Sequence, residues 1–337
     1  MHPAFSVIFF TSASGAGYGL LTFLGLLATL DWLPLNAPFN LSVITLALVL
    51  ITAGLLSSTA HLGHPERAWR ALSQWRSSWL SREGVFAIIT YIPASVFWLA
   101  GGFPDHIATD WEFWGLAAGL CSIITIFCTA QIYASLKTIP QWNSVFVPLV
   151  YLLIGLLDGI LIITFFTILF DLFVADLSWV IIAITILAGV VKLAYWRAAD
   201  KPSGPPSATA TGLSDGSESV ALLDAPTTSE NFVMREMGFR IARKHSLKLR
   251  KITFITLFFT PATAATVILF SQTEAIILIS SLLALVAAGI GTIVERWLFF
   301  AEAKHVVTLF YGTKSLLRFL HKPHKITFAD QVQQMLG

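Results

Sequence analysis

The sequence predicts an all-α, polytopic membrane protein, a bundle of eight transmembrane helices with both termini in the cytoplasm. Of its 337 residues, 56% are hydrophobic and only 12% are charged, whereas a soluble globular protein has about 25% charged residues. The mean hydropathy is +0.76. This composition excludes a nucleic-acid-binding protein, a disordered scaffold and an ordinary cytosolic enzyme.

Eight apolar runs have the length of a membrane span, about 20 residues for roughly 30 Å of hydrocarbon. They lack the alternation of barrel strands, and a spanning backbone must satisfy its own hydrogen bonds, so each run is predicted to be a helix. The predicted spans are Phe5–Leu30, Phe39–Ala60, Gly84–Gly102, Phe113–Tyr133, Val145–Phe170, Leu177–Tyr195, Ile252–Phe270 and Ala275–Phe300.

The placement of charge predicts the orientation. With eight spans, all 21 Lys and Arg residues flank one face, in the segments after the second, fourth, sixth and eighth helices. The segments on the other face carry only acids, namely Asp31, Asp105, Asp110, Glu112, Asp171, Asp176 and Glu274. By the positive-inside rule the basic face is cytoplasmic, and we expect a multi-pass protein of the bacterial inner membrane.

The chain divides into five predicted parts. Pro, Ser, Gly, Ala and Thr dominate one stretch after the sixth span, which indicates a flexible linker. The parts are a six-helix membrane part over 1–197 with a polar loop at 60–83, the cytoplasmic linker 198–230, an amphipathic cytoplasmic helix 231–251, a two-helix membrane part 252–303, and a cytoplasmic tail 304–337.

The loop at 60–83 is the densest polar stretch and begins His61-Leu62-Gly63-His64-Pro65-Glu66-Arg67-Ala68-Trp69-Arg70. Pro65 disfavours helix in the residue before it and so ends the second span. Beyond it, large apolar residues recur at spacings of three and four, which predicts a short helix in the headgroup plane. The alternative is a plain connector with an aromatic belt.

His61 and Glu83 flank this loop, at the end of the second span and the start of the third. Because the two helices are antiparallel, the side chains can converge at one depth, where an imidazole and a carboxylate could bind a quinone and exchange its protons. His64 and, at the same face, Gln131 and Tyr133 could line the headgroup pocket. The alternatives are a helix-terminal cation for His61 and a first-turn acid for Glu83.

Asp158 lies near the middle of the fifth span between Gly155 and Gly159. An acid at that depth is costly and usually faces a polar partner or a proton path. A proton relay and a protonated carboxyl that bonds a neighbouring helix are both open. For Glu295 and Arg296, in the eighth span, snorkelling or an internal ion pair is favoured over catalysis.

Redox centres of its own are not expected in this protein. It has two cysteines, Cys121 and Cys128, and no Cys-x-x-Cys motif, so no iron–sulfur cluster and no metal site are predicted. Membrane haem b needs two histidines from different helices at one depth, and only His61, His64 and His305 approach a span. Haem b is therefore disfavoured.

A second basic segment precedes the seventh span. Within 231–251, Met234, Met237 and Ile241 fall on one helical stripe, surrounded by basic residues that include Arg240, Arg243 and Lys244. Such a helix can bind anionic lipid, and Met-rich faces also suit protein partners. Both roles are open.

The loop motif resembles the dimethyl sulfoxide reductase anchor-subunit family. His61-Leu62-Gly63, Pro65, Arg67-Ala68-Trp69 and Ser77-Ser78-Trp79-Leu80-Ser81-Arg82-Glu83 carry the resemblance, together with Met237-Gly238-Phe239 and Arg243-Lys244-His245. It implies an anchor that binds no metal, docks an iron–sulfur subunit paired with a molybdopterin catalytic subunit, and exchanges electrons with ubiquinone or menaquinone. The quinol-site histidine and glutamate of the family match His61 and Glu83.

The orientation refines that expectation. Respiratory members of the family dock their partners on the periplasmic side, whereas the His61 loop here carries four arginines and should be cytoplasmic. This resembles the branch that serves a cytoplasmic-facing sulfite dehydrogenase, which delivers electrons from sulfite to quinone. The protein itself would not touch sulfite. Arg67, Arg70, Arg76, Arg240, Arg243 and Lys244 are the expected docking residues.

Three alternatives remain at this point. The anchor could oxidise quinol for a dimethyl sulfoxide reductase-type complex. The protein could instead be a secondary transporter with Asp158 as the coupling acid, or a passive tether.

Overall fold

The computed structural model describes residues 3–33, 35–59, 62–107, 109–201, 207–210, 212–213 and 240–307, with only the backbone for 207, 210 and 240–244. Within these ranges every regular element is a helix. They are α1 (Phe5–Thr29), α2 (Ala37–Thr59), η1 (Pro65–Gln74), α3 (Trp79–Gly102), α4 (Trp111–Ala134), α5 (Phe146–Leu169), α6 (Leu177–Ala199), α7 (Ser207–Ala210), α9 (Arg240–Thr253), η2 (Phe254–Phe259), α10 (Thr260–Phe270) and α11 (Glu274–Ala301).

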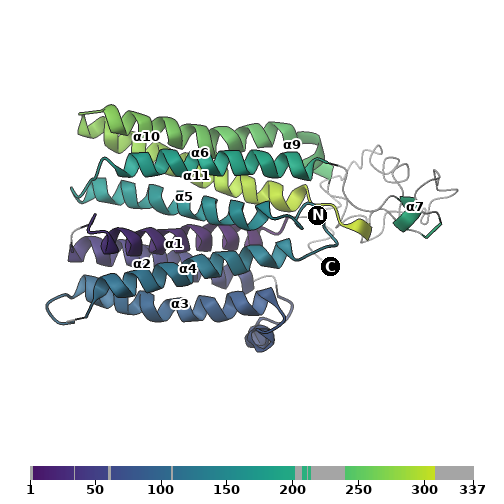
Figure 1. Cartoon of the computed structure of the whole chain (residues 1–337), viewed down its shortest axis with the longest axis horizontal. Helices are drawn as coiled ribbons and strands as arrows, with labels where there is room; N and C mark the ends of the chain where they lie inside the picture. The colour runs from purple at the N-terminus through teal and green to yellow at the C-terminus, as the bar shows by residue number, and fades with distance from the viewer. Residues whose placement is uncertain are drawn as a thin grey trace, which may run out of the picture.

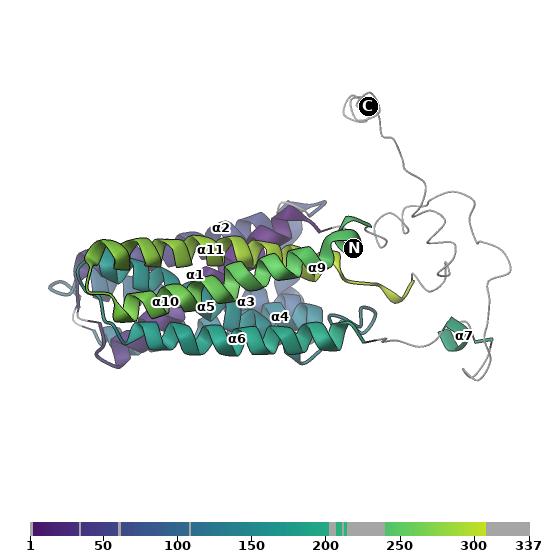
Figure 2. The same cartoon turned by 90° about the horizontal axis from the view of Figure 1, so that it is seen from above.

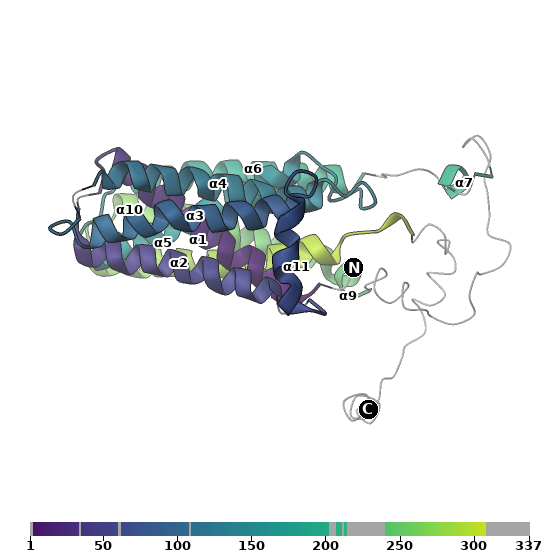
Figure 3. The same ribbon diagram turned by 90° about the horizontal axis from the view of Figure 1, so that it is seen from below.

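In this part of the chain eight helices are long and apolar enough to span a membrane. They run side by side along one axis, and η1 crosses their end (Figure 1; Figure 3). α1 begins and α11 ends at the same end of the bundle (Figure 2). The predicted all-α fold with eight spans is confirmed.

The two ends of the bundle differ in charge. One, the acidic end, carries Asp31, Asp105, Asp110, Glu112, Asp171, Asp176 and Glu274 in its described turns and helix starts. The other, the basic end, carries η1 and the loop over 135–145, together with the ends of α6 and α11 and the start of α9. Two basic residues that the sequence assigned to that face, Lys192 and Arg296, are instead buried inside the bundle.

Local sequence sets several helix boundaries. Asp110 accepts a hydrogen bond from the backbone N–H of Phe113 (3.0 Å), which caps α4. α1 and α5 are each followed, two residues after their last one, by a left-handed residue, Asp31 (φ 58°) and Asp171 (φ 56°). An aspartate tolerates that conformation better than most residues, and the chain reverses there.

The seventh span differs from the prediction. A separate surface helix was expected over 231–251, but from Arg240 the helix continues through a π-helical turn, η2, into α10. Pro261 lacks an N–H donor, and just before it the Thr260 hydroxyl donates to the carbonyl of Ile255 (2.9 Å). Met234 and Met237 lie outside the described residues.

α1 is the most buried span, and close backbone contacts hold it against its neighbours. A Cβ on Gly19 would overlap the carbonyl of Gly155 on α5, and one on Gly25 would overlap Gly115 on α4. Lipid gives apolar helices no hydrophobic reason to associate, so such small-residue contacts supply the packing. Large apolar side chains such as Val49, Leu56 and Ile92 face outward.

Gly19→Ala should destabilise the bundle, because the added methyl group meets the backbone of α5 rather than a side chain that is free to move. Overpacking of this kind costs roughly 1–3 kcal/mol. The measurement is thermal unfolding of the purified protein in detergent, followed by tryptophan fluorescence. Gly15→Ala on the same helix is the control, since its Cβ would meet nothing within 4 Å. Equal melting temperatures for the two variants would contradict this packing.

Candidate functional site

The start of α3 positions Glu83. Ser78 caps the helix through Ser81 N–H (3.4 Å), so α3 begins at Trp79, five residues earlier than the sequence predicted. Glu83 therefore lies in the second helical turn, and the interpretation as a first-turn acid is wrong. Its side chain points into the bundle and is 5% exposed.

The segment before α3 is tied back onto it. The guanidinium of Arg82 donates to the carbonyls of Trp75 (3.0 Å) and Arg76 (2.7 Å) and lies 4.2 Å from the centre of the Trp79 ring. The Ser81 hydroxyl bonds the carbonyl of Ala71. A Cβ on Gly84 would lie 2.7 Å from Leu72, so η1 rests directly against the turn that carries Glu83.

Glu83 has one hydrogen-bond donor in the described structure, the hydroxyl of Thr129 on α4, at 2.6 Å from Oε1. A buried carboxyl in a membrane protein needs such a partner. Tyr18 on α1 is 1% exposed and its hydroxyl has no hydrogen-bond partner in the described structure, so the bundle contains a buried donor that is unused.

The other residues predicted for the quinone site are not all brought to Glu83. His61 lies outside the described residues. His64 is exposed and its Nδ1 lies 3.0 Å from Glu66 Oε1. Gln131 is half-buried at the end of α4. Tyr133 packs into an aromatic cluster with Trp142, Tyr151, Phe299 and Phe300, at centroid distances of 5.3–5.8 Å.

The predicted docking residues on η1 and in the turn just after it face solvent. Arg67, Arg70 and Arg76 are exposed, and so are Trp69 and Trp75 beside them. Arg70 lies over the Trp69 ring (5.6 Å) and Arg76 over Trp75 (5.8 Å). The predicted short helix is confirmed, as a 3-10 helix. Arg240, Arg243 and Lys244 belong to the first residues of α9, 240–244, for which only the backbone is described.

Asp158 is buried on α5, and both carboxyl oxygens accept from the hydroxyl of Thr292 on α11 (3.1 and 3.0 Å). This is the bond to a neighbouring helix that the sequence left open. Next to it lies a charged cluster that sequence reasoning identified only in part. Lys192 Nζ on α6 contacts Glu295 Oε1 on α11.

Arg296 completes this cluster. Its Nη1 lies 3.0 Å from Glu295 Oε2, and its guanidinium lies 3.6 Å from the centre of the Tyr151 ring. The side chains of Lys192, Glu295 and Arg296 are 1%, 0% and 2% exposed. The predicted internal ion pair is confirmed and snorkelling is wrong. Lys192 was missed because a lysine near a span's apparent end is usually one that reaches the headgroups.

At the basic end, Arg250 joins three helices. It donates to both carboxyl oxygens of Asp200, just after α6 (2.7 and 2.9 Å), and to both of Glu302, just after α11 (3.0 and 3.1 Å). A cavity of about 270 Å³ lies beside this clamp. Its lining includes Gln141, Tyr195, Ser246, Phe299 and Lys304.

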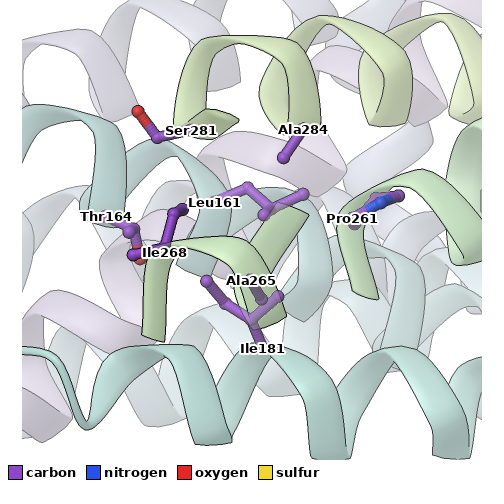
Figure 4. Close-up of a pocket in the computed structure, with 8 residues that line it drawn as sticks. All are labelled: Leu161, Thr164, Ile181, Pro261, Ala265, Ile268, Ser281 and Ala284. Carbon is purple, nitrogen blue, oxygen red and sulfur yellow. The ribbon is translucent and has the colours of Figure 1, made fainter. Parts of the chain in front are cut away.

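The opposite half of the bundle contains a crevice that excludes water. A crevice between α5, α6, α10 and α11 is lined by apolar side chains apart from the hydroxyls of Thr164 and Ser281, and has no room for water (Figure 4). Among the residues that the structure describes, no group of three or more His, Cys, Asp or Glu side chains could hold a metal ion.

The lipid-facing apolar surface, the interior acids and the exposed basic helix define a multi-pass membrane protein with a polar site beneath one end. Residues 1–313 match the model of the DMSO reductase anchor subunit (DmsC) family. The chain belongs to this family of membrane anchor subunits.

Its relatives include a sulfite dehydrogenase subunit and dimethyl sulfoxide reductase chains. A sulfite dehydrogenase subunit of Allochromatium vinosum is 32% identical in an alignment 334 positions long, which covers 92% of this chain and 99% of that one. Anaerobic dimethyl sulfoxide reductase chain YnfH of Escherichia coli is 29% identical over 114 residues, 33% of this chain and 39% of the relative. Another anaerobic dimethyl sulfoxide reductase chain of the same organism is 27% identical over 111 residues, with the same coverage.

Asp200→Asn should reduce stability in a pH-dependent way. The hydrogen bond from Arg250 holds the pKa of the Asp200 carboxyl below its usual range. Its stabilisation is therefore complete above the unfolded pKa of about 3.9 and is lost as pH falls through the lower folded value. Because the Asp200 side chain is 59% exposed, we expect a small effect.

The measurement is the difference in melting temperature between the natural protein and Asp200→Asn from neutral pH into the acid range. The difference should shrink toward zero at the acid end. Asp105→Asn, an exposed acid at the acidic end, is the control. A difference that grows on acidification would contradict the clamp.

Proposed function

We propose that this chain is the quinone-reactive anchor of a sulfite dehydrogenase-type complex in the bacterial inner membrane. It would receive electrons from a cytoplasmic iron–sulfur subunit, paired with a molybdopterin catalytic subunit, and pass them to ubiquinone or menaquinone. The observation that carries this proposal is Glu83, a carboxyl buried between α3 and α4 directly beneath an exposed basic helix.

The chemistry requires proton donors at the membrane boundary. Reduction of a quinone to a quinol takes up two electrons and two protons, so each carbonyl oxygen must receive one proton. Glu83 can hold and transfer a proton while Thr129 fixes its orientation. His61 follows the last residue of α2, Thr59, by two positions and would be the second proton-exchanging group. The free hydroxyl of Tyr18 fits a hydrogen bond to a quinone oxygen.

The basic surface of η1 fits a protein partner. Arg67, Arg70 and Arg76 are exposed beside two exposed tryptophans, and Trp and Arg are enriched at the centres of protein interfaces. A subunit docked there would lie over the turn of α3 that bears Glu83, since Leu72 of η1 contacts that turn. The electron donor and the proton donor would then meet at one place.

Sulfite is favoured over dimethyl sulfoxide by two observations. The match to the sulfite dehydrogenase relative extends over 92% of this chain, whereas the matches to the dimethyl sulfoxide reductase relatives extend over about a third. The basic end bears η1, and positive residues favour the cytoplasmic side. Because the shorter matches are to reductase proteins, the second candidate function is quinol oxidation, the same chemistry in reverse.

Glu83→Gln should abolish quinone reduction while the complex still assembles. The amide oxygen keeps an acceptor for Thr129, but the amide is unable to exchange a proton in the way a carboxyl does. The measurement is sulfite-dependent reduction of a quinone by the purified complex, compared with reduction of an artificial acceptor that takes electrons from the partner subunits. His61→Ala should behave in the same way.

Glu274→Gln, an exposed glutamate at the acidic end, serves as the matched control. Unchanged quinone reduction in both site variants would refute the assignment of the site. A complex that reduces soluble quinone after this protein is removed would show that the anchor is a passive tether.

The orientation is tested by fusion. Green fluorescent protein inserted after Gly212 should fluoresce, because this position lies between α6 and α9 and should be cytoplasmic. Alkaline phosphatase at the same position should be inactive. Fusions after Phe103, between α3 and α4, should give the reverse pattern. Phosphatase activity at Gly212 would place the docking face in the periplasm and favour a reductase.

A further inference from the structure

The charged cluster between α5, α6 and α11 has more polar atoms than partners. Glu295 Oε2, Arg296 Nε and Nη1, and the Tyr151 hydroxyl are all buried without a hydrogen bond. Glu295 Oε2 and Arg296 Nη1 are in ionic contact without hydrogen-bond geometry. Buried polar groups in proteins are normally satisfied, and ordered water does so where the protein does not. The cluster therefore has the composition of a hydrated site.

The cluster adjoins the cavity at the basic end. Tyr195 lines that cavity, and its ring lies 4.3 Å from Lys192 Nζ. Lys192 is seven residues from the end of α6, which puts it about 10 Å inside the bundle at 1.5 Å per residue. Water in the cavity is thus one aromatic side chain away from the buried charges.

On its inner side the cluster approaches Glu83. The Arg296 guanidinium packs on Tyr151, and Tyr151 stacks on Tyr133 at a centroid distance of 5.8 Å with an interplanar angle of 30°. Tyr133 lies one helical turn after Thr129, which bonds Glu83. These residues form a continuous series from the cavity to the acid.

We propose that this series, the polar tract formed by Tyr195, Lys192, Glu295, Arg296, Tyr151 and Tyr133, is a hydrated proton inlet that refills Glu83. This rests on the proposed function. In each turnover the quinone gains two electrons from the iron–sulfur partner and two protons, and becomes a quinol. Glu83 gives up a proton to a quinone oxygen and regains one from water that enters by the cavity. A partner docked over η1 would cover the direct route, so a separate entrance is required.

In the part of the chain that the structure describes, the inlet opens toward the basic end. On its inner side, one helical turn before Glu295, Thr292 of α11 bonds Asp158 of α5. Beyond them α1 and α5 are in backbone contact at Gly19 and Gly159, and the crevice of Figure 4 has no room for water. The protons consumed at the quinone would therefore come from the side on which the partner docks, without a path across the membrane.

A purely structural role for the cluster predicts something different. The Lys192–Glu295 pair joins α6 to α11, and breaking it would destabilise the protein whatever its function. The Tyr151 hydroxyl, by contrast, has no partner, so its removal should leave stability unchanged or improve it. Tyr151→Phe and Tyr133→Phe thus test proton transfer without disturbing the fold.

The experiment uses the purified complex of this protein with its partner subunits. Tyr151→Phe and Tyr133→Phe should each slow sulfite-dependent quinone reduction by a factor on the order of ten to a hundred, at or below the low end of general acid–base effects. The solvent deuterium isotope effect on that rate should rise, because proton delivery becomes limiting. Reduction of the artificial acceptor and the melting temperature should not change.

Thr185→Val is the matched control, because its hydroxyl is also buried without a partner on α6 but lies outside the polar tract. It should change neither the rate nor the isotope effect. The inlet would be overturned if both tyrosine variants reduced quinone at the same rate as the natural protein. It would also be overturned if reduction of the artificial acceptor slowed as much as reduction of quinone. If Glu83→Gln abolishes quinone reduction while the tyrosine variants are normal, the inlet fails and the quinone site stands.

Discussion

The fold depends on how closely α1 approaches its neighbours. In hydrocarbon, apolar side chains gain nothing from leaving lipid, so helices associate through backbone proximity and shape. Gly25 meets Gly115 on α4, and Gly19 meets Gly155 on α5. These contacts hold together the α3–α4 pair that carries Glu83 and Thr129 and the α5–α6–α11 group that carries the charged cluster. Tyr133 of α4 and Tyr151 of α5 stack where these two neighbours of α1 contact each other.

Burial of charge is the second constraint, and the two polar sites satisfy it differently. Glu83 is a single acid with one hydroxyl donor, a simple arrangement that leaves its carboxyl able to change protonation state. Lys192, Glu295 and Arg296 balance part of one another's charge but leave several polar atoms unpartnered. The first arrangement suits a group that reacts, and the second suits one that holds water and orders it. Both lie in the half of the bundle nearer the basic end.

Much of the fold could be predicted from the amino-acid sequence alone. Eight apolar runs and the one-sided distribution of Lys and Arg indicated the spans and their alternation, since both signals are local and strong. The ends of the helices were harder to predict where a helix continues into polar residues. α3 begins at Trp79 because Ser78 caps it, and α9 continues without a break into the seventh span. Asp158 could be selected because an acid inside an apolar run is rare. Glu83 could be selected because it flanks the polar loop at the start of the third span and matches the glutamate of the family motif. Thr129 and Thr292, their partners, carry no such signal, since threonines are common in these helices.

By itself the sequence determined the eight spans, which connecting segments are basic and which are acidic, and the family to which the protein belongs. These properties follow from composition along the chain and need no knowledge of which helix lies beside which. Only the tertiary structure decided that Thr129 bonds Glu83 and Lys192 pairs with Glu295, and that the tyrosines of α4 and α5 stack between them. The physical reason is that no local pattern links these residues: Thr129 and Glu83 are 46 positions apart in the sequence, and Lys192 and Glu295 are 103 apart. Whether two side chains face each other depends on how each helix is rotated about its own axis. Rotation is set by glycine contacts that appear in the sequence only as small residues.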